Sequence, residues 1–426
     1  MKLCVIGLGR LGLPWALVAD AAGHDVRGLD LDRERVTAIN RRRVDTREPG
    51  VAVLLGDPRC GLTATSDPAE ALADIDLSVV TVPTPSQVDG SFGLEAVLAT
   101  MEAIGAQAQR LPRHHVVVLK STVSPGATRG PVHTALAVAS GRRVDLGLVY
   151  APEFHAIGTI VHDITHPYQV ILGGDQEWAL SRVEELHVSL AEAAVSVARL
   201  DATGAELAKL ASNSFRTMKI AFANSLAALC SAYDTDPQSV CAAVGADPHI
   251  GGGYFVPGLP YGGPCYPRDN PALRAAASAV GLTAPLPEAA EAANEQRFRE
   301  LEHVGLAAAP GPIGIVGLGF KPGADELEGS PAVELARRWQ AAGREVVVHD
   351  PLAPGWGSGT SASLNTLLDT CAVVLLAAPD TRLVDALHVE LIGRARHPPI
   401  VDPWGALSWS PALAGRSPRL SRDGAG

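Results

Sequence analysis

The sequence predicts an α/β fold in which two Rossmann-like doubly wound domains are joined by a central helical region. Three observations lead to this prediction. A glycine-rich turn at residues 7–12 follows a short apolar run, and later apolar runs alternate with Ala- and Leu-rich helical stretches, as in parallel sheets. A stretch at 205–232 has helical periodicity and contains neither Gly nor Pro. A second apolar run followed by a glycine turn begins at Ile313.

Length and composition limit the possible functions. The 426 residues suggest two or three domains at roughly 100–200 residues each, and the 47% of hydrophobic residues can fill their cores. With Lys+Arg 35 and Asp+Glu 46 the net charge is −11, so we expect no nucleic-acid partner and only local anion sites. No apolar run reaches about 18 residues, which predicts no membrane segment. Six cysteines without a C-x-x-C pair predict reduced thiols, no metal site and a cytoplasmic protein.

The N-terminal domain, predicted at residues 1–198, begins with a dinucleotide fingerprint. The apolar run 3–6 leads into G-x-G-x-x-G, and the next predicted strand, 25–29, ends at Asp30, 23 residues after Gly7. The glycines serve a tight turn, close approach to a pyrophosphate and helix packing, and a carboxylate about 20 residues on binds the ribose. Asp30 favours NAD over NADP because it repels a 2′-phosphate. The predicted cofactor-binding residues here are Gly7, Gly9, Arg10, Leu11, Gly12 and Asp30.

Further strands are predicted at 77–82, 116–119, 146–149 and 170–172, and two of them end in polar turns. Ligands of doubly wound sheets bind beyond the carboxyl ends of the strands. The two turns therefore predict four more residues on the cofactor side, although ordinary Pro-rich connections are an equal alternative for the turns alone. These residues are Thr84, Pro85, Ser121 and Thr122.

The central region, predicted at residues 199–300, carries two candidate catalytic features. Lys209, Asn213 and Arg216 share one face of the predicted helix at 202–232. Lys and Asn there can donate to a developing oxyanion, and the alternative is a solvated helix face. The second feature is Cys265, in a loop dense in Gly, Pro and aromatic residues. A stiff loop holds a thiol in one place, as a nucleophile requires, and the alternative is a structural cysteine.

The C-terminal domain is predicted at residues 310–411, followed by a disordered tail at 412–426. Its apolar run and glycine turn occupy residues 313–320, and a further strand is predicted at 373–376. Lys321 stands where a dinucleotide fingerprint would have its third glycine, which argues against a second NAD site.

Seven ordered motif matches make the chain, from residue 1 to about 405, resemble the UDP-glucose/GDP-mannose dehydrogenase family. They read GLGRLGLP, VPTP, STVSPGAT, PEF, the helical K-x-x-x-N, GGPCYPRD, and FKP with SPA. The resemblance implies NAD as cofactor, a nucleotide-sugar or nucleoside-type substrate and a homodimer formed through the central helix. It implies a four-electron oxidation of a primary alcohol to a carboxylate, in which Cys265 forms a thiohemiacetal and then a thioester.

The resemblance also implies roles for other residues. Lys209 and Asn213 would stabilise the oxyanions. Asp269 and Thr122 would position water or the base, and Glu153 would assist hydrolysis. The implied substrate-binding residues are Phe154, His155, Lys209, Asn213, His249, Tyr254, Gly262, Phe320 and Lys321, of which Lys321 is also assigned to the cofactor.

Several substrate-side positions depart from the family pattern. After PEF a Leu-Arg-Glu-Gly-like stretch is replaced by residues 155–158, the arginine of DPRIG is His249, and the D-x-R element of the last domain ends in Trp404. Replacing a bidentate arginine at a phosphate site is not a conservative change. The alternatives are therefore a non-catalytic homologue that binds nucleotide sugar or NAD, and a two-electron alcohol dehydrogenase. The glycine fingerprint and Cys265 favour the four-electron enzyme.

Overall fold

The computed structural model describes residues 1–143, 145–323, 326–353, 356 and 360–407. Contacts between residues divide the chain into two compact units. The first contains Met1–Ala211 with Ser278–Val280, and the second contains Ser212–Ala277 with Gly281–Gly426. The tail expected at 412–426 lies outside the described residues. No helix of the described part is long and apolar enough to cross a bilayer.

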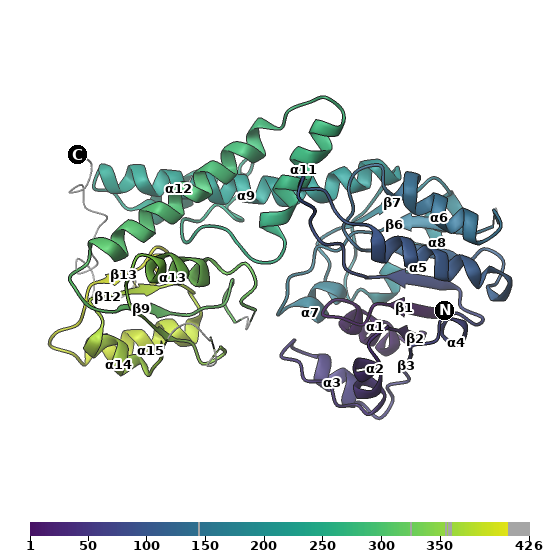
Figure 1. The fold of residues 1–426 in the computed structure, drawn as a ribbon, viewed down its shortest axis with the longest axis horizontal. Helices are drawn as coiled ribbons and strands as arrows, with labels where there is room; N and C mark the ends of the chain where they lie inside the picture. Colours follow the sequence, from purple (N-terminus) through teal and green to yellow (C-terminus); the bar gives the residue numbers. More distant parts are fainter. Residues whose placement is uncertain (144, 324–325, 354–355, 357–359, 408–426) are drawn as a thin grey trace. The chain divides into compact units, whose positions relative to one another are not determined.

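The first unit is built on an eight-stranded sheet with the order β3-β2-β1-β4-β5-β6-β7-β8 (Figure 1). Its strands pair in parallel except for β6 and β7, which are antiparallel. The order reverses between β1 and β4, which is where ligands of such sheets bind. The strands are β1 (Lys2–Ile6), β2 (Asp25–Leu29), β3 (Thr63–Thr65), β4 (Leu77–Val80), β5 (Val116–Leu119), β6 (Gly147–Tyr150), β7 (Val170–Gly173) and β8 (Val197–Leu200).

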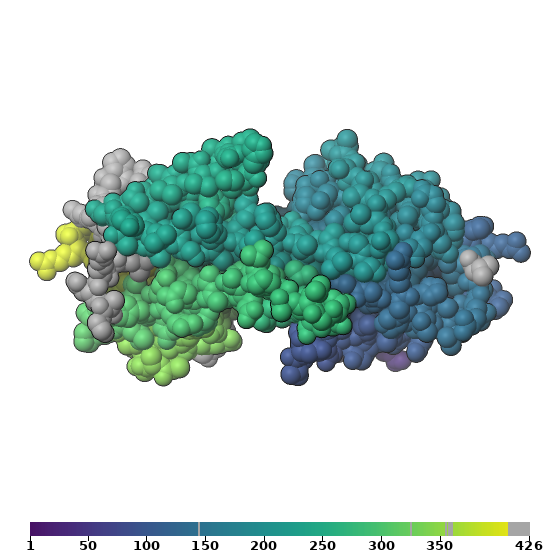
Figure 2. Space-filling model, turned by 90° about the horizontal axis from the view of Figure 1, so that it is seen from above, coloured from purple at the N-terminus to yellow at the C-terminus, as the bar shows by residue number. Residues whose placement is uncertain are grey.

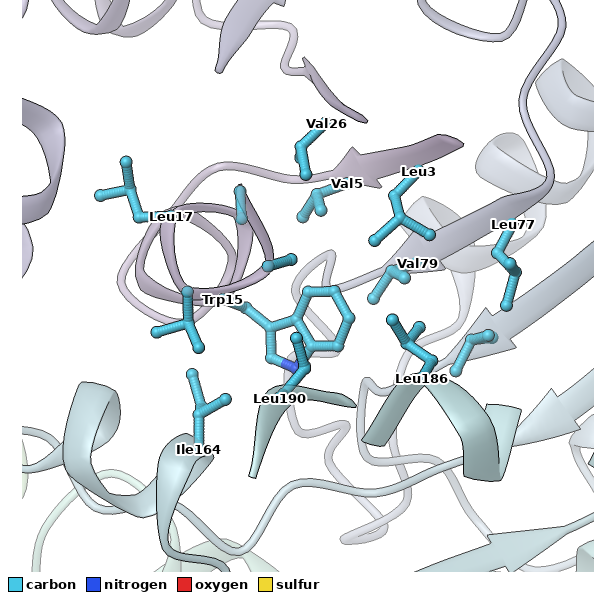
Figure 3. Close-up of a cluster of buried hydrophobic side chains, with 14 of the residues drawn as sticks. Leu3, Val5, Trp15, Leu17, Val26, Leu77, Val79, Ile164, Leu186 and Leu190 are labelled. Carbon is cyan, nitrogen blue, oxygen red and sulfur yellow. The ribbon is translucent and has the colours of Figure 1, made fainter. Parts of the chain in front are cut away.

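Helices cover both faces of this sheet and enclose a core on each. One core surrounds Trp15, which is 2% exposed, and Figure 3 shows its indole among side chains such as Val79 and Leu190. The core on the opposite face includes Met101 and Leu136. The helices are α1 (Gly12–Ala21), α2 (Arg33–Asn40), α3 (Val51–Gly56), α4 (Pro68–Ala71), α5 (Glu95–Ala106), α6 (His133–Ala139), α7 (Ile160–Thr165) and α8 (Glu177–Leu190), with short helical turns η1 (Ala108–Arg110) and η2 (Thr128–Val132).

One long helix, α9 (Ala202–Ala232), belongs to both units. Its 31 residues run without interruption because no Gly or Pro follows Gly204. The second unit continues with α10 (Pro237–Gly245), α11 (Tyr266–Ala279) and α12 (Pro285–Ala307).

The second unit also contains a five-stranded sheet with the order β11-β10-β9-β12-β13, in which every pair is parallel (Figure 1). The strands are β9 (Ile313–Val316), β10 (Val346–His349), β11 (Thr360–Ser361), β12 (Val373–Leu376) and β13 (Ile400–Val401), and the helices are α13 (Pro331–Ala341), α14 (Leu364–Thr370) and α15 (Thr381–Ile392). Trp339 of α13 is buried against α12, where Gly305 leaves room for its indole. The strand-and-turn unit predicted at 313–320 therefore opens a second Rossmann-like sheet.

The predicted fold class is confirmed, with differences at particular strands. The strands expected at 25–29, 116–119 and 373–376 and the helix at 202–232 coincide with the observed elements. The expectation of a parallel sheet does not hold at β7, whose direction is reversed because its link from β6 contains only the six-residue α7 rather than a full crossover helix. The edge strands β3 and β8 were missed because short, partly polar strands give a weak signal.

Candidate functional site

The turn between β1 and α1 has the shape of a dinucleotide cradle. Gly7 has φ +88° and donates its N–H to Leu29 O at 2.8 Å. A Cβ atom on Gly12 would lie 1.8 Å from Gly7 O, so this position accepts only glycine. A Cβ atom on Gly9 would meet nothing within 4 Å, so Gly9 faces open space. The residues fit NAD, since the cradle keeps space for a pyrophosphate where a side chain would otherwise project.

The start of α1 supplies a hydrogen-bond donor to this space. Its N-cap residue, Leu11, makes no side-chain capping bond. Leu13 N–H donates to Gly9 O at 3.1 Å and Pro14 has no N–H, so among the first three residues of the helix the N–H of Gly12 is the one that can serve an anion, which the helix dipole also favours. Arg10 and Leu11 are exposed on the same turn.

Asp30 is fixed at the end of β2 as the fingerprint predicts. Its Oδ2 accepts from Leu8 N at 2.7 Å and its Oδ1 accepts from Asp32 N at 2.9 Å. Arg35 Nη1 lies 3.0 Å from Asp30 Oδ2. These bonds hold the carboxylate beside the glycine turn, where it can accept from a ribose hydroxyl.

The two polar turns predicted on the cofactor side lie next to this cradle. Thr81 Oγ1 donates to Gly7 O at 2.7 Å and so joins the β4 turn to the glycine turn. Ser121 Oγ donates to Val82 O at 2.6 Å and joins the β5 turn to the β4 turn. The three turns thus form one connected set, which also contains the buried Thr84, the exposed Pro85 and the half-buried Thr122. Lys321, also assigned to the cofactor, belongs to the second unit.

A buried ion cluster that the sequence did not predict lies behind the β5 turn. Lys120 is 3% exposed and its Nζ forms an ion pair with Glu153 Oε1. The same Nζ is 3.1 Å from His187 Nε2 and 5.1 Å from the ring centroid of Trp15. His155 Nδ1 lies 2.5 Å from Glu153 Oε2, so both oxygens of this carboxylate have a basic partner. No motif in the sequence marked Lys120 or His187 as members of this cluster.

The cluster fixes the charges of its members. Burial alone would raise the pKa of Glu153, but His155 and Lys120 outweigh it and hold that pKa well below its usual range. Burial, followed by the charge of Lys120, lowers the pKa of His187 to about 3. His187 is therefore neutral, with Nδ1–H donating to Val183 O at 2.9 Å and Nε2 accepting from Lys120.

Lys209 of α9 contacts the PEF segment of the same unit. Its Nζ donates to the backbone oxygen of Glu153 at 2.6 Å and lies 4.9 Å from the ring centroid of Phe154. The side chain is buried, which fixes the position of the ammonium group. The alternative of a solvated helix face is therefore excluded for Lys209.

In the second unit Cys265 directly precedes α11. The glycines of its loop allow the loop to pack closely against the FKP turn and Gly329. A Cβ atom on Gly262 would lie 2.3 Å from Gly329 O, and one on Gly263 would lie 2.6 Å from Phe320 Cδ2. Cys265 O accepts the N–H of Asp269 at 3.1 Å, and its thiol is exposed. Cys265 directly precedes the N-terminus of α11, and the positive end of a helix dipole favours a thiolate.

Asn213 is the buried centre of a polar group in this unit. Its Nδ2 donates to Asp269 Oδ2 at 2.6 Å, and its Oδ1 accepts from Arg216 Nη1 at 3.0 Å. The guanidinium carbon of Arg216 lies 5.2 Å from the ring centroid of Tyr254, which packs edge-on against Tyr266. These two bonds hold the amide of Asn213 in one orientation. Its partner Asp269 follows Cys265 by four positions, one helical turn along α11.

One predicted substrate residue lies apart from this group within a single chain. The side chain of His249 is 91% exposed and bonds only the neighbouring Asp247, at 2.8 Å, among the contacts described for it. Among the described residues, no group of three or more His, Cys, Asp or Glu side chains could hold a metal ion.

Comparison with known proteins identifies the family. The NAD binding domain of the UDP-glucose/GDP-mannose dehydrogenase family matches residues 1–191, its central domain residues 203–296 and its UDP binding domain residues 314–408. The chain belongs to this family. It is an NAD-dependent oxidoreductase of nucleotide sugars.

Relatives and solved structures agree with this assignment. UDP-glucose 6-dehydrogenase AglM of Haloferax volcanii is 35% identical over 83% of this chain and 84% of its own. GDP-mannose 6-dehydrogenase of Pseudomonas putida is 32% identical over 82% of this chain and 81% of its own. The structure of a UDP-glucose dehydrogenase from Pyrobaculum islandicum matches with a TM-score of 0.87 and 31% identity, covering 96% of both chains.

The glycine cradle generates a paired prediction. We expect Gly12→Ala to lower the free energy of unfolding by about 2 kcal/mol or more, because its Cβ meets a backbone oxygen, and to abolish NAD binding. Gly9→Ala should change stability by less than about 0.5 kcal/mol, because its Cβ meets open space, yet weaken NAD binding. Urea unfolding and NAD titration measure the two effects. A Gly12→Ala protein with normal stability and NAD affinity would contradict the cradle.

The buried histidine generates a pH prediction. Unfolded His187 takes up a proton near pH 6.5, which the folded side chain refuses until about pH 3. Its contribution to the unfolding free energy should therefore fall by about 2 kcal/mol between pH 7 and pH 5. His187→Gln keeps an acceptor for Lys120 but cannot titrate, so its stability should decline less over this range. Equal pH slopes for the two proteins in urea unfolding would show that His187 is not held neutral.

Proposed function

We propose that the enzyme oxidises the primary alcohol of a nucleotide sugar to a carboxylate by way of a thioester on Cys265. The observation that carries this proposal is the exposed thiol at the start of α11, with Asp269 bonded both to the backbone of Cys265 and to the amide of Asn213. A two-electron alcohol dehydrogenase has no use for such a thiol. We propose a cytoplasmic location with it, because a reactive thiol persists in a reducing compartment.

The first oxidation converts the alcohol to an aldehyde with loss of a hydride and a proton. NAD, when bound, would supply the hydride acceptor for this step, and a second molecule of NAD would supply it for the later one. We assign Lys209 to the developing negative charge on the substrate oxygen, since its ammonium group is held by Glu153 O and the Phe154 ring. Thr122 and Asp269 are assigned to the positioning of the base or of water.

The second oxidation requires the thiol. The Cys265 thiolate adds to the aldehyde carbon, and the new C–S bond makes that carbon tetrahedral. Asn213, whose amide is oriented by Asp269 and Arg216, is assigned to the resulting oxyanion together with Lys209. Loss of a second hydride then gives the thioester.

Water completes the reaction by attacking the thioester. The C–S bond then breaks, the carboxylate product is released, and Cys265 is regenerated as the thiolate. We assign Glu153 to this step. Because Lys120 and His155 hold its carboxylate ionised, Glu153 acts as a fixed negative charge rather than as a base that takes up a proton.

The residues that we assign to substrate binding, besides Lys209 and Asn213, come from the family resemblance. They are Phe154, His155, Tyr254, Gly262, Phe320 and Lys321. The relatives are named for UDP-glucose and GDP-mannose, and a Pyrococcus horikoshii structure for UDP-D-ManNAc. With His249 and Trp404 in place of arginines, we propose a nucleotide sugar other than UDP-glucose.

We also propose a homodimer formed through α9. Phe215, Phe222 and Leu229 recur every seven residues on α9 and are 58%, 58% and 56% exposed. A row of large apolar side chains on one helix face is the pattern of a buried helix contact. In Figure 2 the teal segment that includes this helix lies on the surface of the second unit. In such a dimer we propose that the exposed His249 contacts the substrate bound to the other copy.

The chemical proposal is tested by counting NADH. A panel of UDP-glucose, GDP-mannose and UDP-D-ManNAc should contain a substrate that yields two NADH per molecule consumed. Cys265→Ser should form carboxylate on the order of 10³-fold more slowly or worse, because the aldehyde cannot become a thiohemiacetal. Cys60→Ser, at a half-buried cysteine of the first unit, is the matched control and should retain two NADH. Two NADH per substrate with Cys265→Ser would refute the mechanism.

The dimer proposal is tested by mass. Light scattering should give twice the chain mass for the wild type and for Val53→Glu, a change at an exposed position of α3. Phe222→Glu should shift the protein to the monomer, because a carboxylate cannot be buried unpaired in an apolar contact. A monomeric wild type, or a Phe222→Glu dimer of unchanged stability, would contradict the assignment of α9.

A further inference from the structure

Glu206 is a fully buried carboxylate in the first turns of α9, with an exposed fraction of 0%. Its Oε2 accepts from Gly126 N at 2.5 Å and its Oε1 accepts from Thr128 N at 2.8 Å. Both donors belong to the segment that follows β5. A buried carboxylate is costly to ionise, and burial accordingly raises the pKa of Glu206, against the opposing effect of these N–H groups and of Arg129. A neutral side chain at this position would therefore have a lower desolvation cost than the ionised carboxylate.

The segment held by Glu206 is the one that carries the predicted cofactor residues. Gly126 has φ +89°, so the chain turns sharply there before η2 begins at Thr128. Five residues earlier, Ser121 Oγ is bonded to the β4 turn. The carboxylate accepts the N–H of Thr128, the first residue of η2, and that of Gly126 just before it. Glu206 therefore caps this helical turn from another element and sets the shape of the loop 121–128.

The same helix face carries the next functional side chain. Lys209 follows Glu206 by three positions, and its Nζ binds Glu153 O at 2.6 Å. Within the first unit, α9 thus holds the loop 121–128 through Glu206 and the PEF segment through Lys209. If the loop 121–128 moved relative to α9, the predicted cofactor residues would move relative to the ammonium group of Lys209.

We propose that Glu206 is a positioning residue that fastens the cofactor loop 121–128 to the helix bearing Lys209, and that its ionised carboxylate is needed for full NAD affinity. The inference rests on the proposed function only for the role of Lys209. The charged side chain that acts on Glu206 is Arg129, which is itself paired with Asp175 and Asp201. Burial raises the pKa of Glu206, whereas the bond with Arg129 lowers the pKa of Asp175, so Glu206 takes up a proton before Asp175 does as the pH falls.

The test is Glu206→Gln, which keeps the size of the side chain but places an amide N–H₂ against a backbone N–H. We expect the Kd for NAD, measured by calorimetry without any sugar, to rise about tenfold while the melting temperature changes little. Glu185→Gln, at an exposed residue of α8, is the matched control and should bind NAD as the wild type does. A folded Glu206→Gln protein whose Kd for NAD stays within twofold of the wild type would overturn the proposal.

The pH dependence gives a second readout that a merely structural role would not produce. NAD binding to the wild type should weaken as the pH is lowered and Glu206 takes up a proton, and Glu206→Gln should lack this trend. If the variant does not fold, the wild-type measurement decides, since a Kd that stays constant as the pH falls contradicts the proposal. Because no turnover is measured, a failure of sugar oxidation leaves this result interpretable, and the two proposals can fail separately.

Discussion

The continuity of α9 is the constraint on which the proposed chemistry depends. Glu206, Lys209 and Asn213 lie on one face of the helix, and each bonds a different segment: the β5 turn, the PEF segment and the start of α11. These spacings are fixed only because the backbone hydrogen bonds of the helix are unbroken, and no Gly or Pro after Gly204 breaks them. A kink between Lys209 and Asn213 would separate the two groups assigned to the oxyanion.

The two Rossmann-like sheets share one hydrogen-bond pattern, but they differ in where the next helix begins. Asp30 accepts from Leu8 N at 2.7 Å, and Asp350 at the end of β10 accepts from Leu318 N at 2.6 Å. In the first unit α1 follows the glycine turn directly, so that the N–H of Gly12 and the positive end of the helix dipole can serve a phosphate. In the second unit the next helix among the described residues, which omit 324–325, is α13, and it begins at Pro331 rather than directly after the glycine turn.

Much of the fold could be predicted because it follows from local patterns. The glycine fingerprint, the apolar runs and the uninterrupted helix each specify an element from neighbouring residues, and Asp30 follows by its spacing. The ion cluster of Lys120 and His187 could not be predicted, because it joins residues 67 positions apart and contradicts the usual exposure of charged side chains. Glu206 was missed for the same reason: its partners are backbone N–H groups 78 and 80 residues away, which leave no mark in the sequence.

The central claim is that the substrate becomes covalently bound to Cys265. It is tested most directly by stopping the reaction in acid during turnover with NAD and the substrate that gives NADH, then analysing the peptides by mass spectrometry. The account predicts a substrate-derived acyl group on the peptide that contains Cys265, formed in the wild type and absent from Cys265→Ala. Carboxylate production with no adduct on Cys265, or with an adduct on another residue, would contradict it.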